Sequence, residues 1–461
     1  MTFSSLKNVL LCGREDQKEV SFSMGESICW SQFLSDIKRL TAPLNELNMD
    51  RWAICCDDSY HFCVAFFAAV YADKKIILPG NHQPAMLSSL SDHFDAIIHD
   101  GLVAGDFNKE QLLLPWTDKQ QITEITFSEL DLSQIEITLF TSGSSGLPKA
   151  VCKSLFMLDA EITQLESQWG DLLADTRIVS TVSHQHIYGL LFRILWPLCA
   201  GRAFQRVDLV YPEQLVTYAE NNHTLISSPA LLKRLQNDQQ SRPYRAIFSS
   251  GGPLSLASAQ QCKQLFALYP LEVFGSTETG GIGYRQQLQA TPPWTFFPGI
   301  VSQLREDSCL SLRSPWIDKN RWYQTSDQCE LLQNNQFILK GRVDRIVKIE
   351  EKRISLIEIE QRLNQLEWIE ESAVLVIDDL HRLSLGAVLK LSDRGQNTME
   401  QLGKGKFWIK LRQALRLWLE PVGIPRHYRV VSEIPVNKQG KRIYNNISCL
   451  FKNKNLVNKA E

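Results

Sequence analysis

Short apolar runs alternate with amphipathic stretches up to residue 300, as is typical of an α/β domain. Trp52–Cys56 is predicted to form a buried strand, Ser59–Tyr71 a helix and Lys75–Leu78 a second strand that ends at Pro79 and Gly80. Together they predict a βαβ unit. Because the alternation recurs, we expect a large α/β domain with a mostly parallel sheet, with further strands at Ile178–Val182, Leu225–Ser227, Ala246–Ser249 and Leu271–Phe274.

The pattern changes after residue 300 to shorter β-like pieces at Cys309–Arg313, Glu330–Leu332 and Gln336–Leu339. A charged segment then begins at Lys340. It precedes a small α+β pattern, with helices expected at Ile354–Leu366 and Phe407–Leu419 and strands at Glu371–Ile377 and Leu383–Lys390. We therefore expect a large domain over residues 1–340 and a small one over 341–461, joined near Gly341 by a connection short enough for a hinge.

Composition narrows the class of protein. Of 461 residues, 44% are hydrophobic and 22% are charged, and the formal net charge is −2. This charge argues against bulk electrostatic binding to nucleic acid or anionic membrane. The amino terminus lacks a signal-peptide pattern, and apolar runs such as Phe62–Ala72 are too short to span a bilayer. The eleven cysteines show no Cys-x-x-Cys spacing, so we expect reduced thiols and a cytoplasmic protein.

The segment Thr141–Lys149 carries the clearest chemical signal. It has the sequence Thr-Ser-Gly-Ser-Ser-Gly-Leu-Pro-Lys and follows the strand-like run Ile135–Phe140. Glycine- and hydroxyl-rich backbone exposes several N–H groups that bind phosphate oxygens, and Lys149 adds a cation. The spacing is not that of the usual P-loop, and a polar surface turn is the alternative.

Four further segments follow in order: Phe274–Gly280, Tyr323–Asp327, Gly341–Glu360 and Ile434–Lys441. With the Thr141–Lys149 segment, the chain resembles the adenylate-forming superfamily of acyl- and aryl-CoA synthetases, peptide-synthetase adenylation domains and luciferases. The resemblance covers nearly the whole chain and is weakest before residue 130. It indicates the reaction type more strongly than the substrate.

The resemblance implies that ATP activates a small-molecule carboxylic acid. Pyrophosphate is released, and a thiol of CoA or of an acyl carrier protein's phosphopantetheine then attacks the acyl-adenylate. Its catalytic residues would be Lys441, Thr277, Glu278 and His186, with Glu278 also the Mg²⁺ ligand and Asp344 the hinge. Its nucleotide-binding positions would be Thr141, Ser142, Gly143, Ser144, Ser145, Gly146, Lys149, Gly251, Gly275, Ser276, Thr277, Asp327 and Arg342.

Within this set, the resemblance implies that Thr277 contacts the α-phosphate and that Asp327 accepts both ribose hydroxyls. Lys441 would bridge the acid and the α-phosphate, and its loss would cost about 3–4 kcal/mol of adenylation barrier. Taken singly, Glu278 and Lys441 would be solvated surface charges, Asp327 a turn cap, and Arg342 with Asp344 a surface ion pair.

Two histidines, His184 and His186, could suggest a metal, but their spacing and the lack of further ligands nearby disfavour one. The resemblance instead places His186 beside the acyl pocket. Gly251 and the glycines of Gly280–Gly283 match stretches that line the acyl slot and adenine site, with ordinary β-turns as the alternative.

Several positions depart from the family pattern: Ser145, Ala150, Ser326, Arg345 and Glu351. Glu351 matters most, because family CoA ligases usually have glycine where the small domain flanks the pantetheine tunnel. Adenylation is therefore better supported than transfer to free CoA. The main hypothesis is an AMP-forming aryl or acyl acid–thiol ligase. The alternatives are an adenylating enzyme with another acceptor and a degenerate nucleotide-binding protein without turnover.

Overall fold

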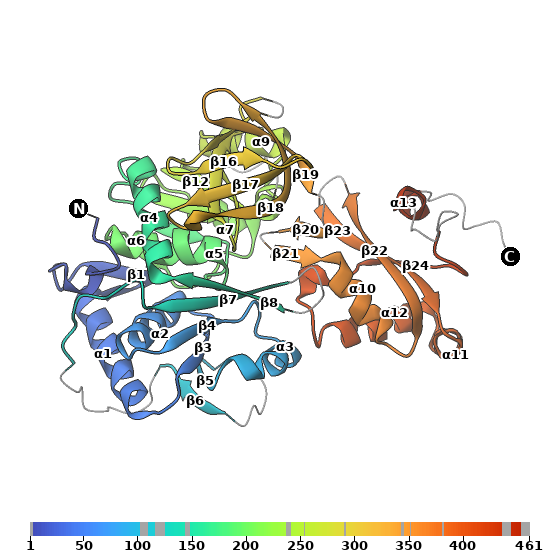
Figure 1. Cartoon of the computed structure of the whole chain (residues 1–461), viewed down its shortest axis with the longest axis horizontal. Coiled ribbons are helices and arrows are strands. Elements are labelled where there is room, and N and C mark those ends of the chain that lie inside the picture. Colours follow the sequence, from blue (N-terminus) through green and yellow to red (C-terminus); the bar gives the residue numbers. More distant parts are fainter. Residues whose placement is uncertain are drawn as a thin grey trace. The chain divides into compact units, whose positions relative to one another are not determined.

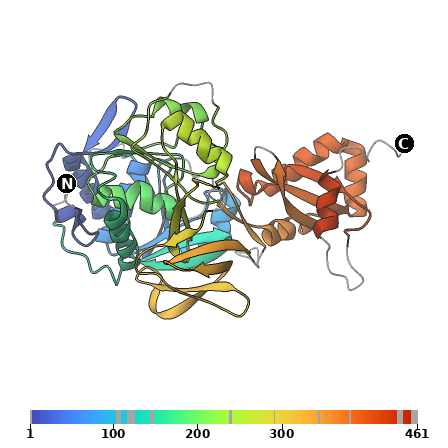
Figure 2. The same ribbon diagram turned by 90° about the horizontal axis from the view of Figure 1, so that it is seen from above.

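The computed structural model describes residues 3–101, 109–115, 125–142, 148–236, 241–252, 254–289, 292–342, 345–350, 352–379, 382–435 and 444–452. The chain folds into two compact units (Figures 1 and 2). The first comprises Met1–His82, Ser88–Thr141 and Ala150–Val343, and the second comprises Gln83–Leu87, Ser142–Lys149 and Asp344–Glu461.

A six-stranded sheet contains the predicted βαβ unit. Its spatial order is β6 (Glu110–Leu113), β5 (Ala96–His99), β3 (Arg51–Cys55), β4 (Lys75–Leu78), β7 (Glu136–Ser142) and β8 (Pro148–Ser154). The strands from β6 to β7 pair in parallel. Helix α2 (Ser59–Tyr71) packs on β3 and β4, and α1 (Trp30–Glu46) packs on α2. Because α2 lies between these layers, nearly all its side chains are apolar and buried.

A thirteen-stranded sheet forms the rest of the first unit's framework. Its order is β16 (Val301–Leu304), β17 (Cys309–Ser314), β18 (Asp318–Leu332), β19 (Gln336–Arg342), β15 (Trp294–Phe296), β14 (Gly280–Gln286), β13 (Leu271–Ser276), β12 (Ala246–Ser249), β11 (His223–Ser227), β9 (Arg177–Ser180), β10 (Phe204–Gln205), β1 (Glu19–Ser23) and β2 (Glu26–Cys29). The strands from β1 to β13 are parallel, whereas both flanks are antiparallel.

Helices and single turns join these strands. They are α3 (Pro84–Ser89), α4 (Leu155–Trp169), α5 (Ile187–Gly189), α6 (Trp196–Cys199), α7 (Pro212–Thr217), α8 (Pro229–Leu232), α9 (Leu256–Phe266), a π-helical stretch at Leu190–Leu195 and 3₁₀ turns at Val9–Leu11 and Ser91–His93. Trp169 at the end of α4 packs edge-on against Phe248, Tyr284 and Phe297, with ring centroids 5.0–5.6 Å apart. These contacts fix α4 against the large sheet.

The second unit has a three-stranded sheet, orange to red in Figure 1, in which β22 (Ile369–Asp379) pairs antiparallel with β23 (Arg382–Leu391). β23 pairs in parallel with β24 (His427–Val430). The other elements are a hairpin of β20 (Ile346–Ile349) and β21 (Lys352–Ser355), helices α10 (Leu356–Asn364), α11 (Asp393–Leu402), α12 (Lys404–Leu415) and α13 (Tyr444–Lys452), and a 3₁₀ turn at Pro421–Gly423. Apolar residues of α10 and α12 form its core with the sheet.

The α/β fold class predicted from the sequence is confirmed, with the parallel strands at the centre of the large sheet. Three predicted segments coincide with α2, β4 and β12 residue by residue. The helix predicted from Ile354 begins instead at Leu356, because the Ser355 hydroxyl caps it by accepting the N–H of Glu358. The piece predicted at Glu330–Leu332 is the end of the long strand β18.

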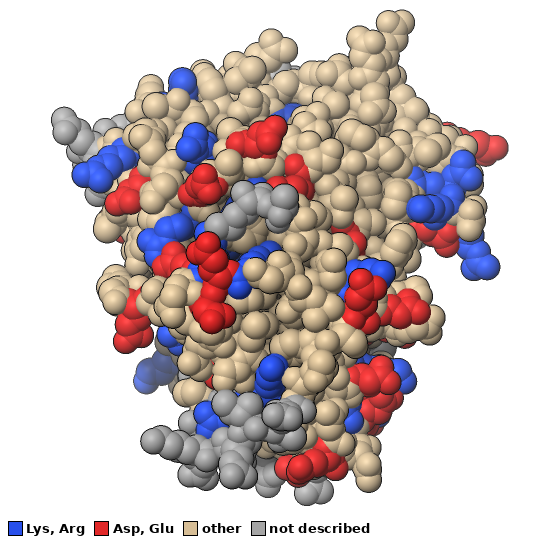
Figure 3. All heavy atoms as spheres, turned by 90° about the vertical axis from the view of Figure 1, so that its left-hand side faces the viewer, with Lys and Arg blue, Asp and Glu red and all other residues tan. Residues whose placement is uncertain are grey.

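Charged side chains of both signs share the surface. On the face drawn in Figure 3, the described Lys and Arg side chains are interspersed with Asp and Glu, and neither sign dominates. Among the described helices, none is both long and apolar enough to cross a bilayer.

Candidate functional site

One edge of the large sheet brings several predicted site residues together. Strands β9, β11, β12 and β13 run parallel, so their carboxyl ends lie along the same edge. In parallel sheets this edge is where ligands bind. The predicted residues that follow these strands are His186 after β9, Gly251 after β12, and Thr277 with Glu278 after β13.

The link between β13 and β14 is a three-residue turn, Thr277–Thr279, held by its own polar groups. The Ser276 N–H donates to Thr279 Oγ1 over 3.1 Å, and the Thr279 N–H donates to Ser276 Oγ over 3.2 Å. The two hydroxyl oxygens are 2.9 Å apart. Because Ser276 and Thr279 satisfy each other, Thr277 and Glu278 occupy the tip, where Thr277 is buried and Glu278 half-buried.

Two glycines make this turn sterically possible. A Cβ on Gly275 would lie 2.1 Å from the carbonyl oxygen of Gly280, so only glycine fits there. Gly280 has a φ of +62°, in the left-handed region, as expected for the last position of such a hairpin. Gly275 was predicted from its motif; its role here is to let the two strands approach.

Asp327 and Arg342 come from different motifs but are partners in the pairing of β18 with β19. Asp327 is buried, at 6% exposure, and its N–H donates to the Thr325 hydroxyl over 3.1 Å. The pairing therefore brings the predicted ribose and phosphate residues to one place. Ser326, where the family has glycine, is half-buried within the strand and fits an ordinary strand position.

The predicted phosphate-binding segment connects β7 and β8, which are neighbours in the six-stranded sheet. Thr141 is half-buried at the end of β7, and Lys149 is exposed on β8. Ala150, where glycine is usual, is exposed, so this position has room for its methyl group. Gly143, Ser144, Ser145 and Gly146 lie outside the described residues, as do Asp344, Glu351 and Lys441; Ser142 is described by its backbone alone.

The two histidines differ in role. His184 is buried, with Nε2 2.8 Å from the carbonyl oxygen of Cys56 and Nδ1 2.9 Å from the Ser59 hydroxyl. A carbonyl only accepts, so Nε2 carries the proton and Nδ1 accepts from Ser59. Burial, aided by nearby Arg193, lowers the pKa of His184 to about 4. His186 is half-buried at the start of α5, at the edge described above.

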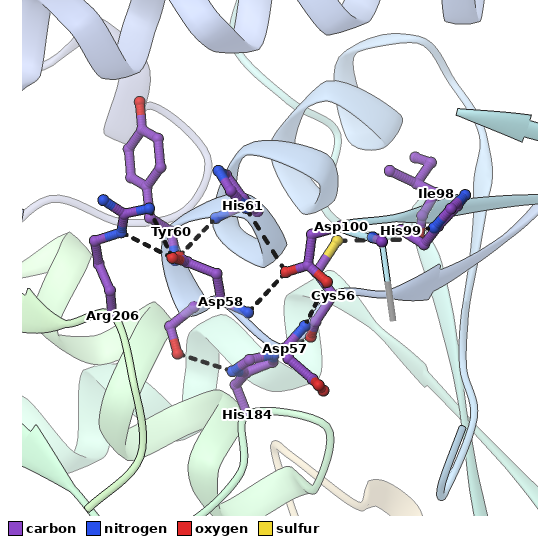
Figure 4. A network of polar contacts seen from close by, with 12 residues as sticks. Cys56, Asp57, Asp58, Tyr60, His61, Ile98, His99, Asp100, His184 and Arg206 are labelled. Atoms are coloured by element: carbon purple, nitrogen blue, oxygen red, sulfur yellow. Dashed lines mark hydrogen bonds and ion pairs between the residues drawn. The ribbon is translucent and has the colours of Figure 1, made fainter. Parts of the chain in front are cut away.

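A polar network fixes the segment before His186 (Figure 4). Asp58 caps α2 through the N–H groups of Tyr60 and His61 and accepts from the Arg206 guanidinium over 2.8 Å. Asp100, just beyond β5, accepts the N–H groups of Asp57 and Asp58. Through Ser59 and His184, this network joins the carboxyl ends of β3 and β5 to the chain that leads to His186.

Sequence reasoning missed two buried charged residues behind the turn, Lys153 and Glu161. The Lys153 ammonium donates to the carbonyl oxygen of Glu278 over 3.2 Å, and a carboxylate oxygen of Glu161 accepts the Gly281 N–H over 2.6 Å. A signal was present: Lys153 shares a strand face with buried Val151, and Glu161 lies between the core positions Leu158 and Ile162 on α4.

Comparison with known sequences supports the motif reading. Residues 76–300 match the sequence model of a family described as AMP-binding enzyme. A 4-coumarate–CoA ligase from Rhodobacter capsulatus is 24% identical over 302 residues, covering 65% of this chain and 73% of that protein. A mitochondrial malonate–CoA ligase from Xenopus laevis is 21% identical over 513 aligned positions, covering 89% of this chain and 85% of that protein.

Solved structures share the fold over nearly the whole chain. An amide bond synthetase from Marinactinospora thermotolerans superposes with a TM-score of 0.82 at 17% identity, covering 97% of this chain and 99% of that one. A malonyl-CoA ligase in complex with methylmalonyl-CoA and AMP gives 0.78 at 16% identity, covering 94% of this chain and 100% of that one. These findings show that residues 76–300 match the AMP-binding enzyme family and that the whole chain shares its fold with these solved structures, which supports the resemblance to the adenylate-forming superfamily found in the sequence.

Proposed function

We propose that this protein is an AMP-forming ligase that activates an aryl or acyl carboxylic acid and transfers it to a phosphopantetheine thiol. Relatives named as CoA ligases support this reaction class. The observation that carries the proposal is the β13–β14 turn, which holds Thr277 and Glu278 at the carboxyl edge of the parallel strands. Its cytosolic location is part of the proposal and rests on the sequence.

In the first half-reaction, a carboxylate oxygen of the acid attacks the α-phosphorus of ATP. The bond from that phosphorus to the bridging oxygen breaks, and pyrophosphate leaves. Thr277 contacts the α-phosphate, and the segment containing Thr141 and Lys149 holds the β- and γ-phosphates. Lys441 bridges the acid and the α-phosphate as negative charge accumulates, which is the kind of preorganised contact that lowers such barriers.

Glu278 suits a magnesium ion. Mg²⁺ prefers hard oxygen ligands and is commonly held by one or two carboxylates together with substrate phosphates. The half-buried Glu278 at the tip of the turn supplies carboxylate oxygens of this kind. A bound ion would neutralise charge on the triphosphate.

Asp327 holds the ribose in this proposal. Its two carboxylate oxygens can each accept from one hydroxyl of a vicinal diol. Its pairing opposite Arg342 puts a guanidinium-bearing residue at the same place on the sheet, suited to the ribose or the phosphates.

In the second half-reaction, a deprotonated thiol attacks the acyl carbonyl carbon, and the bond to AMP breaks. We propose that the small domain rotates about Asp344 between the two half-reactions, presenting Lys441 first and the Glu351–Arg353 strand second. Asp344→Pro, which restricts backbone rotation, should then preserve adenylate formation and impair thioester formation. Equal loss of both half-reactions would contradict the hinge.

A second candidate function delivers the adenylate to a nucleophile other than a pantetheine thiol. The sequence favours it at one position, Glu351, where a carboxylate replaces the glycine of family CoA ligases. Glu351→Gly should raise CoA transfer if this side chain narrows the tunnel. If the variant shows no gain in CoA transfer while adenylation proceeds, Glu351 does not obstruct the tunnel, and this argument for another acceptor fails.

The test is acid-dependent ATP–pyrophosphate exchange over benzoic, cinnamic, short-chain and long-chain acids. Lys441→Ala should slow exchange by about 100- to 1,000-fold. Lys438→Ala, three residues earlier, removes an equal charge and is expected to exchange like the wild type. Binding of ATP without exchange for any acid would contradict the proposal and favour a nucleotide-binding protein without turnover.

A further inference from the structure

Lys153 of β8 is buried, at 2% exposure, yet its ammonium bonds only to main-chain oxygens among the described residues. Nζ lies 3.2 Å from the carbonyl oxygen of Glu278 and 2.9 Å from that of Trp316. Burying an ammonium is costly unless it is well hydrogen-bonded. One of its two bonds therefore goes to the residue that we propose as the magnesium ligand.

Glu161 of α4 holds the other end of the turn. Oε1 accepts the Gly281 N–H over 2.6 Å, while Oε2 has no hydrogen-bond partner among the described residues. A Cβ on Gly280 would lie 2.3 Å from Oε2, so the carboxylate packs directly against that glycine. The Trp316 indole N–H donates to the Gly281 carbonyl over 3.0 Å and completes the contacts.

These contacts hold the main chain at Glu278 and just after the turn, at Gly280 and Gly281, without using the side chain of Thr277 or Glu278. Burial lowers the pKa of Lys153, and the nearby Glu161 and Glu278 oppose that shift. Burial raises the pKa of Glu161 to about 7, and Lys153 opposes it. Each charge thus depends on the other for compensation, although the hydrogen bonds of both go to main-chain groups.

We propose that Lys153 and Glu161 are positioning residues that hold the Thr277–Glu278 turn in its ATP- and magnesium-binding conformation. This inference rests on the proposed function of the turn. Outer groups that orient ligands typically change metal affinity or activity by about 10- to 100-fold when removed. Lys153 also lies four residues after Lys149 on the same strand, so β8 supplies both a phosphate-segment cation and a support for the turn.

The test compares Lys153→Met, Glu161→Gln and the double variant in acid-dependent exchange, titrated separately with ATP, Mg²⁺ and acid. Lys153→Met should raise the KM for ATP and the Mg²⁺ requirement by about 10- to 100-fold, with the KM for the acid unchanged. Glu161→Gln keeps an oxygen acceptor for the Gly281 N–H, so it should raise the KM for ATP and the Mg²⁺ requirement by less than Lys153→Met does.

The double variant separates positioning from stability. Removing one charge leaves the other buried and uncompensated, whereas removing both restores neutrality. We expect the double variant to unfold at nearly the wild-type temperature but to keep the raised ATP and Mg²⁺ requirement. Recovery of both stability and wild-type kinetics would overturn the proposal.

Glu166→Gln is the matched control. Glu166 is on the same helix and pairs with Arg202 over 2.8 Å, away from the turn. Glu166→Gln should leave the dependence of exchange on ATP and Mg²⁺ unchanged. If it shifts that dependence as much as Lys153→Met does, the proposal is overturned. If the wild type binds ATP but shows no exchange, the proposed function fails. Calorimetric dissociation constants for MgATP then decide the inference: weaker binding in Lys153→Met supports it, and unchanged binding overturns it.

Discussion

Two pairs of opposite charge, one in each unit, are built differently. In the second unit, Arg345 and Glu360 form a direct two-point ion pair with N···O distances of 2.8 and 3.0 Å. Both also bond to the main chain of Val374 in β22. In the first unit, Lys153 and Glu161 instead bond to main-chain groups within and just after a turn, at Glu278 and Gly281.

The difference separates a structural pair from a positioning pair. Arg345 and Glu360 neutralise each other and join the start of the second unit to α10 and β22, so their loss should affect stability. Lys153 and Glu161 act on the backbone of two proposed ATP-site residues, so their loss should affect ATP and Mg²⁺ use. Four substitutions test this difference between the two pairs.

Glu360→Ala should have the largest effect on stability. It leaves the Arg345 guanidinium and the Val374 N–H without this partner. Breaking a fully buried pair costs about 3–5 kcal/mol, and because the Arg345 side chain is 28% exposed we expect a loss of about 3 kcal/mol. Thermal unfolding followed by circular dichroism measures the loss. Glu370→Ala is the control, because its pair with Lys390 is more exposed and is worth less than about 1 kcal/mol. Equal losses in the two variants would contradict the structural role.

The pH dependence of stability should reveal Glu161. With a folded-state pKa of about 7 against an ordinary 4.5, the folded protein keeps this proton to higher pH than the unfolded chain. Its contribution is therefore complete below pH 4.5 and is lost as the pH rises through about 7, by on the order of 2–3 kcal/mol. Urea unfolding at pH 5 and pH 8 should show that the free energy of unfolding falls less between these pH values in Glu161→Gln than in the wild type. An identical loss in wild type and variant would argue that Glu161 does not titrate in this range.

Gly280→Ala tests how closely Glu161 packs on the turn. Left-handed backbone costs an alanine about 1–2 kcal/mol, and here the new methyl group would also meet the Glu161 carboxylate. Gly13→Ala is matched in φ, at +63°, but its methyl group meets no described atom within 4 Å. We expect the ATP dependence of exchange to change only in Gly280→Ala. The same kinetics in both variants would mean that the packing is unimportant.

Tyr444→Leu should have the smallest effect. The Arg345 guanidinium carbon lies 4.6 Å from the centre of the Tyr444 ring, an interaction worth about 0.5–1 kcal/mol at a partly exposed site. Chemical denaturation should show that loss for Tyr444→Leu and none for Tyr444→Phe, which keeps the ring. If the two variants unfold alike, the ring does not contribute through its contact with Arg345.

Elements with a uniform pattern were predictable from the sequence. α2 is apolar along its length and begins after Asp58, whose carboxylate caps it, so both its type and its start could be read. β4 and β12 are short apolar runs. Only the end of the long strand β18, Glu330–Leu332, was predicted, because polar and charged residues interrupt the apolar pattern along the rest of the strand.

Site residues were predictable only where they belong to a recognisable sequence motif. The turn with Thr277 and Glu278 came from its motif, whereas its supports did not, since a buried lysine contradicts the usual reading of charge as surface. Arg345 was noted only as a departure from an acidic family position. The structure supplies its reason: Glu360, fifteen residues later, is the acid that it pairs with.

The assignment of the β13–β14 turn to the ATP site is tested by a Mg²⁺ titration of acid-dependent ATP–pyrophosphate exchange in the wild type and Glu278→Gln. We expect exchange with one class of acid in the wild type. In the variant we expect a higher Mg²⁺ requirement and a rate about 100- to 1,000-fold lower, because a charged oxygen ligand is replaced by a neutral amide. Exchange by Glu278→Gln at the wild-type rate and Mg²⁺ concentration would contradict the assignment of this turn to the ATP site.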